Sequence, residues 1–365
     1  MATREDTRAA REEKLEALHE RLTGAVEQLV TGEDWARALR FAARFRSRSF
    51  NNTLLIFAQH LEAFEQGRVP EPLPSYVAGY RQWEQLGRHV QRGQAGYQIY
   101  APVKARFASS TPSDPESWRR LERGEKPRPG EVVRSKMVSV RPAYVWDVSQ
   151  TEGTPIPEPP SPTLLEGEAP AGLWEGLAAQ VREEGFELVR APDATSLRGA
   201  NGVTNFTEHT VSVREDMDPA AQVKTLAHEL GHALMHGPEN EDAIAHRGIA
   251  EVEAESVALM VGAAHGMDTT GYTIPYVATW AARVDGTDPS EVVKATGERV
   301  RKTATSILDR LGTTQITDGT PPGLTHESTG RDTAVDRPGR SPARRRDPLP
   351  EPARSPVRAG DGRGL

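Results

Sequence analysis

The 365 residues of this chain suffice for about two domains of roughly 100–200 residues each, and they include no cysteine. Disulfide frameworks, thiol catalysis and cysteine-ligated metal sites are therefore excluded, so any metal ion needs His, Asp or Glu ligands. Hydrophobic residues make up only 36%, beside 32 Gly and 28 Pro, which indicates that part of the chain is not packed.

The sequence shows no sign of membrane insertion or export. No window approaches the run of about 18 apolar residues that a membrane-spanning helix requires. The first twelve residues alternate charges where a secretory signal has an apolar stretch. We therefore expect a cytoplasmic protein without a membrane partner.

The net charge of −7 is unevenly distributed along the chain. Residues 36–107 contain eleven Lys or Arg and four Asp or Glu, whereas residues 173–312 contain twelve and twenty-two. The basic block predicts a polyanionic partner, and the acidic block argues against nucleic acid on that half. The two halves are therefore expected to bind different molecules.

Helix and strand signals alternate in the first half. Apolar residues between Leu15 and Leu29 recur at three- and four-residue intervals, which predicts an amphipathic helix. A second helical stretch is expected from Asp34, its N-cap. This order predicts an α+β domain over residues 1–151. The predicted elements are helices at 7–30, 34–64 and 80–86, strands at 93–107 and 132–148, and an exposed insertion at 108–131.

A linker, a second α+β domain and a tail are predicted after the first half. Residues 152–172 contain six prolines, typical of a semi-extended linker. Residues 313–365 hold eight Pro, seven Gly and nine Arg, and are expected to be disordered. The domain between them, at 173–312, has predicted helices at 173–184, 248–265, 274–284 and 290–311, a strand at 186–190, a hairpin at 202–213 and a long helix from 218.

The segment KTLAHELGHALMH carries a metal-binding pattern. His228 and His232 are four residues apart, so on a helix both imidazoles project from nearly the same face. With Glu229 they form H-E-x-x-H, in which two His bind zinc and the Glu activates water. Manganese, cobalt or nickel could take the same ligands, but the motif type favours Zn²⁺.

A hydrolytic zinc site needs a third protein ligand and one open position. A Gly and a third His farther along the same helix are excluded, because Met235 and Pro238 occupy those positions. A Glu of the following helix remains. Glu251 and Glu255 are one turn apart, so one can bind the metal while the other orients a ligating His. Glu253 points about 160–200° away from both and is the weaker candidate.

Peptide-bond hydrolysis is the chemistry that such a site would support. The metal lowers the pKa of its water toward about 7, and Glu229 accepts the proton. The strand at 210–213 is expected to pair with an extended substrate. Candidates for a donor to the oxyanion are His236, His246, His265, Tyr272 and Tyr276.

The basic block is also rich in aromatic residues, with eleven of the chain's twenty-one between residues 36 and 107. Cations for phosphates and ring faces for bases are what a single-strand binder combines. Aromatics at helical spacing are more typical of a core, so we expect the DNA contacts to come from turn and strand residues. These are Arg81, Trp83, Arg88, Arg92, Tyr97, Lys104 and Arg106.

Both halves resemble known families. His228, Glu229 and His232, with the E-x-x-A-E run from Glu251 to Glu255, resemble the gluzincin-like metallopeptidase domain of the ImmA/IrrE type and of ArdC-type antirestriction proteins. The blocks SFNNTLLIFAQ, VAGYRQWEQLGRHVQRGQAGYQIYAPV and YVWDVSQTEG resemble the N-terminal domain of ArdC-type proteins, associated with single-stranded DNA binding.

The resemblance implies specific roles. Zinc would be held by His228, His232 and Glu251, with Glu229 as general base and Glu255 supporting a ligand. We therefore expect a single-stranded DNA-binding protein with a zinc peptidase acting on an unidentified protein substrate, in antirestriction. The alternatives are a non-catalytic DNA-binding protein with structural zinc, and an ImmA/IrrE-like protease that cleaves a repressor. The insertion and the tail depart from the family pattern.

Overall fold

In the computed structural model, which describes residues 4–157, 167–238, 247–272, 274–282, 284 and 286–324, the chain begins with three helices. They are α1 (Arg4–Glu27), α2 (Gly32–Arg44) and α3 (Phe50–Glu65). The N-cap of α2 is Thr31 and not the predicted Asp34. Thr31 Oγ1 accepts from the Asp34 N–H (3.1 Å), and the Asp34 carboxylate accepts from the Thr31 N–H (2.9 Å), which forms a capping box. Ser49 caps α3 separately, so the single predicted stretch is two helices.

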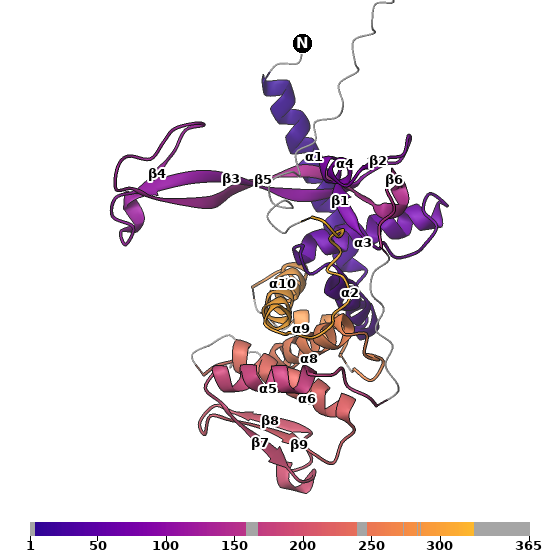
Figure 1. The fold of residues 1–365 in the computed structure, drawn as a ribbon, viewed down its shortest axis with the longest axis vertical. Coiled ribbons are helices and arrows are strands. Elements are labelled where there is room, and N and C mark those ends of the chain that lie inside the picture. Colours follow the sequence, from indigo (N-terminus) through magenta and orange to yellow (C-terminus); the bar gives the residue numbers. More distant parts are fainter. Residues whose placement is uncertain are drawn as a thin grey trace, which may run out of the picture.

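Two long antiparallel strands, β3 (Tyr97–Ser109) and β5 (Val132–Asp147), project far beyond the body of the molecule (Figure 1). We call residues 103–139 the arm. The predicted insertion forms its far end and holds a short 3₁₀ turn (Pro115–Ser117) and β4 (Arg119–Arg120). The four-stranded sheet has the order β1-β5-β3-β4, with β1 at Val77–Gly79. Helix α4 (Tyr80–Gln85) precedes β2 (Arg88–Val90), which pairs with β6 (Thr151–Gly153), a strand that extends into the predicted linker.

The second half packs helices on one face of a small sheet (Figure 1). Its strands are β7 (Glu187–Ala191), β8 (Gly202–Asn205) and β9 (Thr210–Arg214), in the order β7-β9-β8. Because β9 is paired with β7 on one side and with β8 on the other, the predicted pairing of a substrate with residues 210–213 is wrong. β7 and β8 are the edge strands of this sheet. The helices are α5 (Leu173–Glu183), α6 (Pro219–Met235), α8 (Arg247–Ala264), α9 (Val277–Ala281) and α10 (Pro289–Asp309). The mixture of helix and sheet confirms the predicted α+β class.

The hydrophobic core runs continuously from α1 and α2 into α6, α8 and α10. Trp35, on α2, is fully buried, and its ring packs edge-on against Trp280 of α9, with centroids 5.4 Å apart. The sequence predicts two domains, at 1–151 and 173–312, joined by a linker, but it does not predict that they share a hydrophobic core. Helix α2 lies between the halves because it is apolar on two faces, with Phe41 in a separate core beneath the long sheet.

Residues 313–324 belong to the folded structure, contrary to the predicted start of the disordered tail. The Ile316 N–H donates to Ala264 O (2.8 Å), and the Val77 N–H donates to Gly319 O (3.0 Å), so this segment joins the two halves. Residues 158–166 of the predicted linker and 325–365 of the predicted tail lie outside the described residues. None of the described helices combines the length and apolar character that crossing a membrane requires.

Candidate metal centre

Helix α6 carries the H-E-x-x-H pattern and is fixed at its start and along its buried face. Asp218 caps it by accepting from the Ala221 N–H (2.9 Å), and Pro219 occupies its first turn. Gly231 lets α8 cross closely, since a Cβ at this position would lie 3.3 Å from Ala254 Cα. The close crossing brings a turn of α8 over the two imidazoles.

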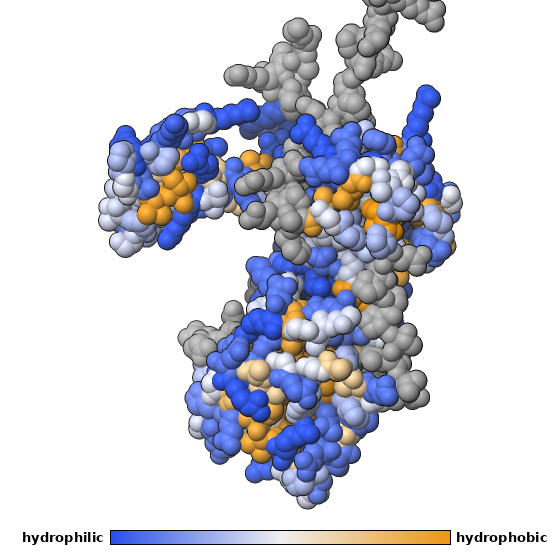
Figure 2. Space-filling view, in the orientation of Figure 1, coloured by the Kyte–Doolittle hydropathy of each residue, from blue (hydrophilic) through white to orange (hydrophobic). Residues whose placement is uncertain are grey.

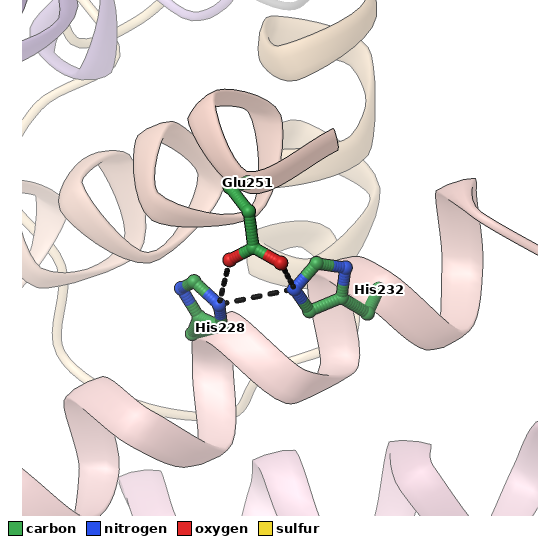
Figure 3. Close-up of side chains that lie close together, drawn as sticks. All are labelled: His228, His232 and Glu251. Atoms are coloured by element: carbon green, nitrogen blue, oxygen red, sulfur yellow. Dashed lines mark hydrogen bonds and ion pairs between the residues drawn. The ribbon is translucent and has the colours of Figure 1, made fainter. Parts of the chain in front are cut away.

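Three side chains from these helices converge on one point (Figure 3). The Nε2 atoms of His228 and His232 are 3.0 Å apart, and Glu251 oxygens lie 3.5 and 3.6 Å from them. Two donors, each at about 2.0–2.1 Å from a tetrahedral ion, are about 3.3 Å apart, so the observed separations fit one shared cation. The Glu251 side chain is 69% exposed, which leaves the site open to solvent.

The electrostatic surroundings favour a cation at this point. Burial lowers the pKa of His228, but the hydrogen bonds to Glu251 and Glu255 outweigh it and raise that pKa to about 9. The potential that attracts a proton also attracts a metal ion. Glu255 accepts from His228 Nδ1 (3.2 Å) and pairs with Lys224 Nζ (3.0 Å). The ring of His228 is therefore held with Nε2 directed at the site.

A second chain of hydrogen bonds holds His232. Its Nδ1 lies 2.9 Å from His236 Nδ1, and His236 Nε2 lies 3.0 Å from Glu253 Oε2. Arg299 Nε donates to the other Glu253 oxygen (2.7 Å). With His232 donating to His236 and His236 donating to Glu253, His232 Nε2 carries the lone pair that a metal needs. Sequence reasoning considered Glu253 only as a ligand and missed this role, although the i, i+4 spacing from His232 to His236 was a signal.

Glu229 lies in the wall of the site and is only 5% exposed. Burial raises the pKa of its carboxyl above the ordinary value. Thr204 Oγ1 on β8 donates to Glu229 Oε2 (2.7 Å), which fixes the carboxyl group. A Cβ at Gly202 would lie 2.7 Å from Glu229 Oε1, so β8 can pass this close only with glycine there. These groups line a cavity of about 520 Å³ that also contains both ligating imidazoles.

The predicted oxyanion donors have other partners or lie elsewhere. His265 is buried between Val261 O (2.7 Å) and Thr313 Oγ1 (2.7 Å). The Tyr272 hydroxyl donates to Ala258 O (3.3 Å), and its ring lies under Lys224 Nζ. Tyr276 is 61% exposed and precedes α9. His236 supports His232, as described above, and His246 lies outside the described residues.

Four of the seven predicted DNA contacts are exposed, and the other three are not. The expectation that Trp83 and Tyr97 are exposed is wrong, because Trp83 is buried with its Nε1 donating to Trp146 O (3.0 Å), and Tyr97 is buried with its hydroxyl 2.8 Å from His60 Nδ1. Arg88 donates to Thr151 Oγ1 and O (2.8 Å each), so its guanidinium holds β2 against β6. Four predicted residues are exposed, on α4, after β2 and on the arm. They are Arg81, Arg92, Lys104 and Arg106.

The chain is similar to several known proteins. An uncharacterised protein of Bacillus anthracis is 22% identical over 320 residues, which are 82% of this chain and 51% of that protein, so the chain spans about half of its length. Two crystal structures of the antirestriction ArdC protein from plasmid R388 are 18% identical and cover 72% of this chain. The metal-free structure is covered to 84% with a TM-score of 0.44, and the Mn(II)-bound structure to 88% with a TM-score of 0.40.

Two family models match separate parts of the chain. Residues 10–143 match the N-terminal domain of anti-restriction factor ArdC. Residues 189–273, which include the whole H-E-x-x-H segment and Glu251, match the IrrE N-terminal-like domain. The resemblance predicted from the sequence is therefore confirmed, and the chain combines an ArdC-like N-terminal domain with an IrrE N-terminal-like domain.

Proposed function

We propose that this protein binds single-stranded DNA through its first half and hydrolyses peptide bonds at a zinc site in its second half, in an antirestriction role. The observation that carries the hydrolase part is the convergence of His228, His232 and Glu251 beside the buried Glu229. The DNA-binding part is supported by the match of residues 10–143 to the ArdC N-terminal domain and by exposed basic residues.

The donor set favours a catalytic over a purely structural zinc site. Structural sites are closed by four protein ligands, whereas catalytic sites keep one position open. Within the described part of the chain, the metal-binding cluster has three members, and its Glu251 faces solvent. A bound zinc ion would supply the Lewis acidity that activates water and polarises a carbonyl group.

The chain's own residues would carry the remaining work. Glu229, held by Thr204, would accept a proton from water and pass it to the leaving amine. Its raised pKa brings the carboxyl nearer to the range in which it can both accept and release that proton. An extended peptide would pair with the edge strand β8, whose Gly202, Val203 and Thr204 line the cavity.

Metal analysis of the full-length protein tests the ligand assignment. We expect about one zinc per chain in the wild type, loss of the metal in His228→Ala and Glu251→Ala, and retention in the matched variant His19→Ala, which removes an exposed imidazole on α1. Full occupancy in the first two variants would exclude these ligands.

Proteolysis tests the catalytic assignment with casein as the probe, with and without a single-stranded oligonucleotide. Glu229→Gln should retain zinc and abolish cleavage, because it removes the base but no ligand. Cleavage by this variant at the wild-type rate would contradict the role of Glu229, and absence of cleavage by the wild type would favour the non-catalytic alternative.

A further inference from the structure

The arm, residues 103–139, is a basic segment that projects from the molecule (Figure 1). It carries nine Lys or Arg and five Asp or Glu, a net charge of +4, whereas the remaining 328 residues carry −11. Arg119 is the one arm cation in an ion pair among the described residues, with Glu125 and Glu131. The other eight are all exposed: Lys104, Arg106, Arg120, Arg123, Lys126, Arg128, Arg134 and Lys136.

Packing within the protein does not account for this composition. The arm extends away from both halves, and its outer strands bury little apolar surface (Figure 1). A two-stranded ribbon is only marginally stable by itself, and repulsion between eight like charges weakens it further. A polyanionic partner would relieve that repulsion.

Aromatic rings lie among these cations on one side of the ribbon. Phe107 is directly opposite Arg134, and Ala105 is opposite Lys136, so both cations share the face of Phe107. Trp118 joins them, with the Arg134 guanidinium 4.8 Å and the Lys136 ammonium 5.6 Å from its ring centroid. We call Phe107, Trp118, Arg134 and Lys136 the platform.

Exposed apolar side chains lie on both faces of β5. Val132, two residues before Arg134, shares the face of the platform and is 45% exposed, whereas Met137, which directly follows Lys136, is 66% exposed on the other face. Figure 2 shows the arm as largely hydrophilic with a hydrophobic patch in its outer part. Apolar and aromatic groups flanked by cations suit unpaired bases, which stack on rings while their phosphates meet Lys and Arg. A duplex hides those base faces and offers mainly phosphates to such a surface.

We propose that the arm is a binding surface for single-stranded nucleic acid, with bases stacked on the platform and the backbone held by Arg134 and Lys136. The inference rests on the proposed DNA-binding function but assigns it to the arm, in which residues 108–131 were predicted only as an exposed insertion. It also shifts the contacts from Trp83 and Tyr97, which are buried, to residues with no predicted role.

Fluorescence anisotropy with a labelled oligothymidine and the full-length protein tests the assignment. Two arm variants are informative, Trp118→Ala and the double charge reversal Arg134→Glu with Lys136→Glu. Loss of one stacked base costs about 1–3 kcal/mol, so Trp118→Ala should raise Kd by about fivefold or more. If two phosphate contacts are lost, the double variant should lower the slope of log Kd against log salt by about 1.4.

The chain offers a matched control. Arg190 lies 4.2 Å from the centroid of the Trp174 ring in the second half, a pair of the same kind as Arg134 with Trp118. Arg190→Glu and Trp174→Ala should leave the Kd unchanged. The exchange Arg134→Lys with Lys136→Arg should retain binding. If the double variant Arg134→Glu with Lys136→Glu does not fold, the double variant Lys104→Glu with Arg106→Glu replaces it.

The outcomes separate this inference from the proposed function. Wild-type binding with unchanged Kd in the arm variants would overturn the inference and leave DNA binding by the first half standing. Absence of wild-type binding to the oligonucleotide at low salt would overturn both. A duplex that competes more strongly than the single strand, with equal dependence on the arm, would overturn the preference for unpaired bases.

Discussion

The indole N–H of Trp35 donates a hydrogen bond to Ser256 Oγ over 2.9 Å, although the residues are 221 positions apart in the chain. Trp35 belongs to α2 of the first half, and Ser256 follows Glu255 on α8. The helix that supplies Glu251 to the metal centre is therefore packed directly on the ArdC-like half. Any displacement of α2 acts on the helix that carries the third candidate ligand.

This contact predicts that the halves unfold together. Trp35→Ala should lower the free energy of unfolding by about 3–5 kcal/mol, because it leaves a cavity in the shared core. Ser256→Ala should cost about 1–3 kcal/mol, because the buried indole N–H loses its acceptor. Urea unfolding, followed by fluorescence and by circular dichroism, should give one coincident transition. Two separate transitions in the wild type would contradict a shared core.

The chain from His232 through His236 to Glu253 predicts an effect on metal affinity. His236→Ala should weaken binding of zinc by about 10–100-fold, because His232 loses the partner that fixes its ring. Competition with a chelating dye measures the affinity, and His19→Ala is the control. The effect should be smaller in Glu253→Gln, which keeps an acceptor for His236. Equal affinities in wild type and His236→Ala would show that His232 is oriented without it.

The close approach of Gly202 to Glu229, the proposed general base, predicts a steric effect of a larger residue at position 202. In Gly202→Ala the new methyl group would lie 2.6 Å from Thr225 Cγ2 and 2.7 Å from Glu229 Oε1, so strand or carboxylate must move. We expect a loss of about 1–3 kcal/mol in the free energy of unfolding and a loss of any peptidase activity. Gly271→Ala is the matched control, since nothing lies within 4 Å of its added Cβ. Urea midpoints compare the two variants.

His265 predicts sensitivity to acid. Burial lowers the pKa of this imidazole below its ordinary value, and Arg46 adds to the effect. The unfolded chain therefore binds the proton first, and stability should be complete above about pH 6.5 and fall as the pH drops toward the folded-state pKa. His265→Gln should flatten the dependence of the urea midpoint on pH in this range, while His19→Gln, which alters an exposed residue, should not.

Local patterns predicted the elements and part of the site, while long-range packing determined the rest. The i, i+4 spacing of His228 and His232 is a property of one helix, and so the sequence was sufficient to place both imidazoles on one face. The central position of β9 depends on which strands pair, which alternation within 210–213 does not encode. Trp83 lies among basic residues in the sequence, yet its own neighbours in space are apolar.

Glu253 illustrates the same limit within a single helix. Helical periodicity correctly directs it away from Glu251, which lies two residues earlier. On an isolated helix that direction would lead to solvent. Here His236, the residue that follows α6, and Arg299 of α10 pair with the Glu253 carboxylate. Tertiary packing therefore gives Glu253 a buried ionic role in supporting the metal centre, which the sequence of the helix does not indicate.

The two apolar faces of α2 make the halves inseparable as recombinant fragments. A polypeptide ending near residue 153 would leave Trp35 and Leu39, both fully buried in the intact protein, in contact with water. Such a fragment would tend to self-associate through the exposed apolar face of α2. An oligonucleotide affinity measured on it would then be that of aggregates and not of the folded protein. Point variants of the intact protein, and not dissection into domains, are therefore the appropriate way to assign activities to the two ends of this molecule.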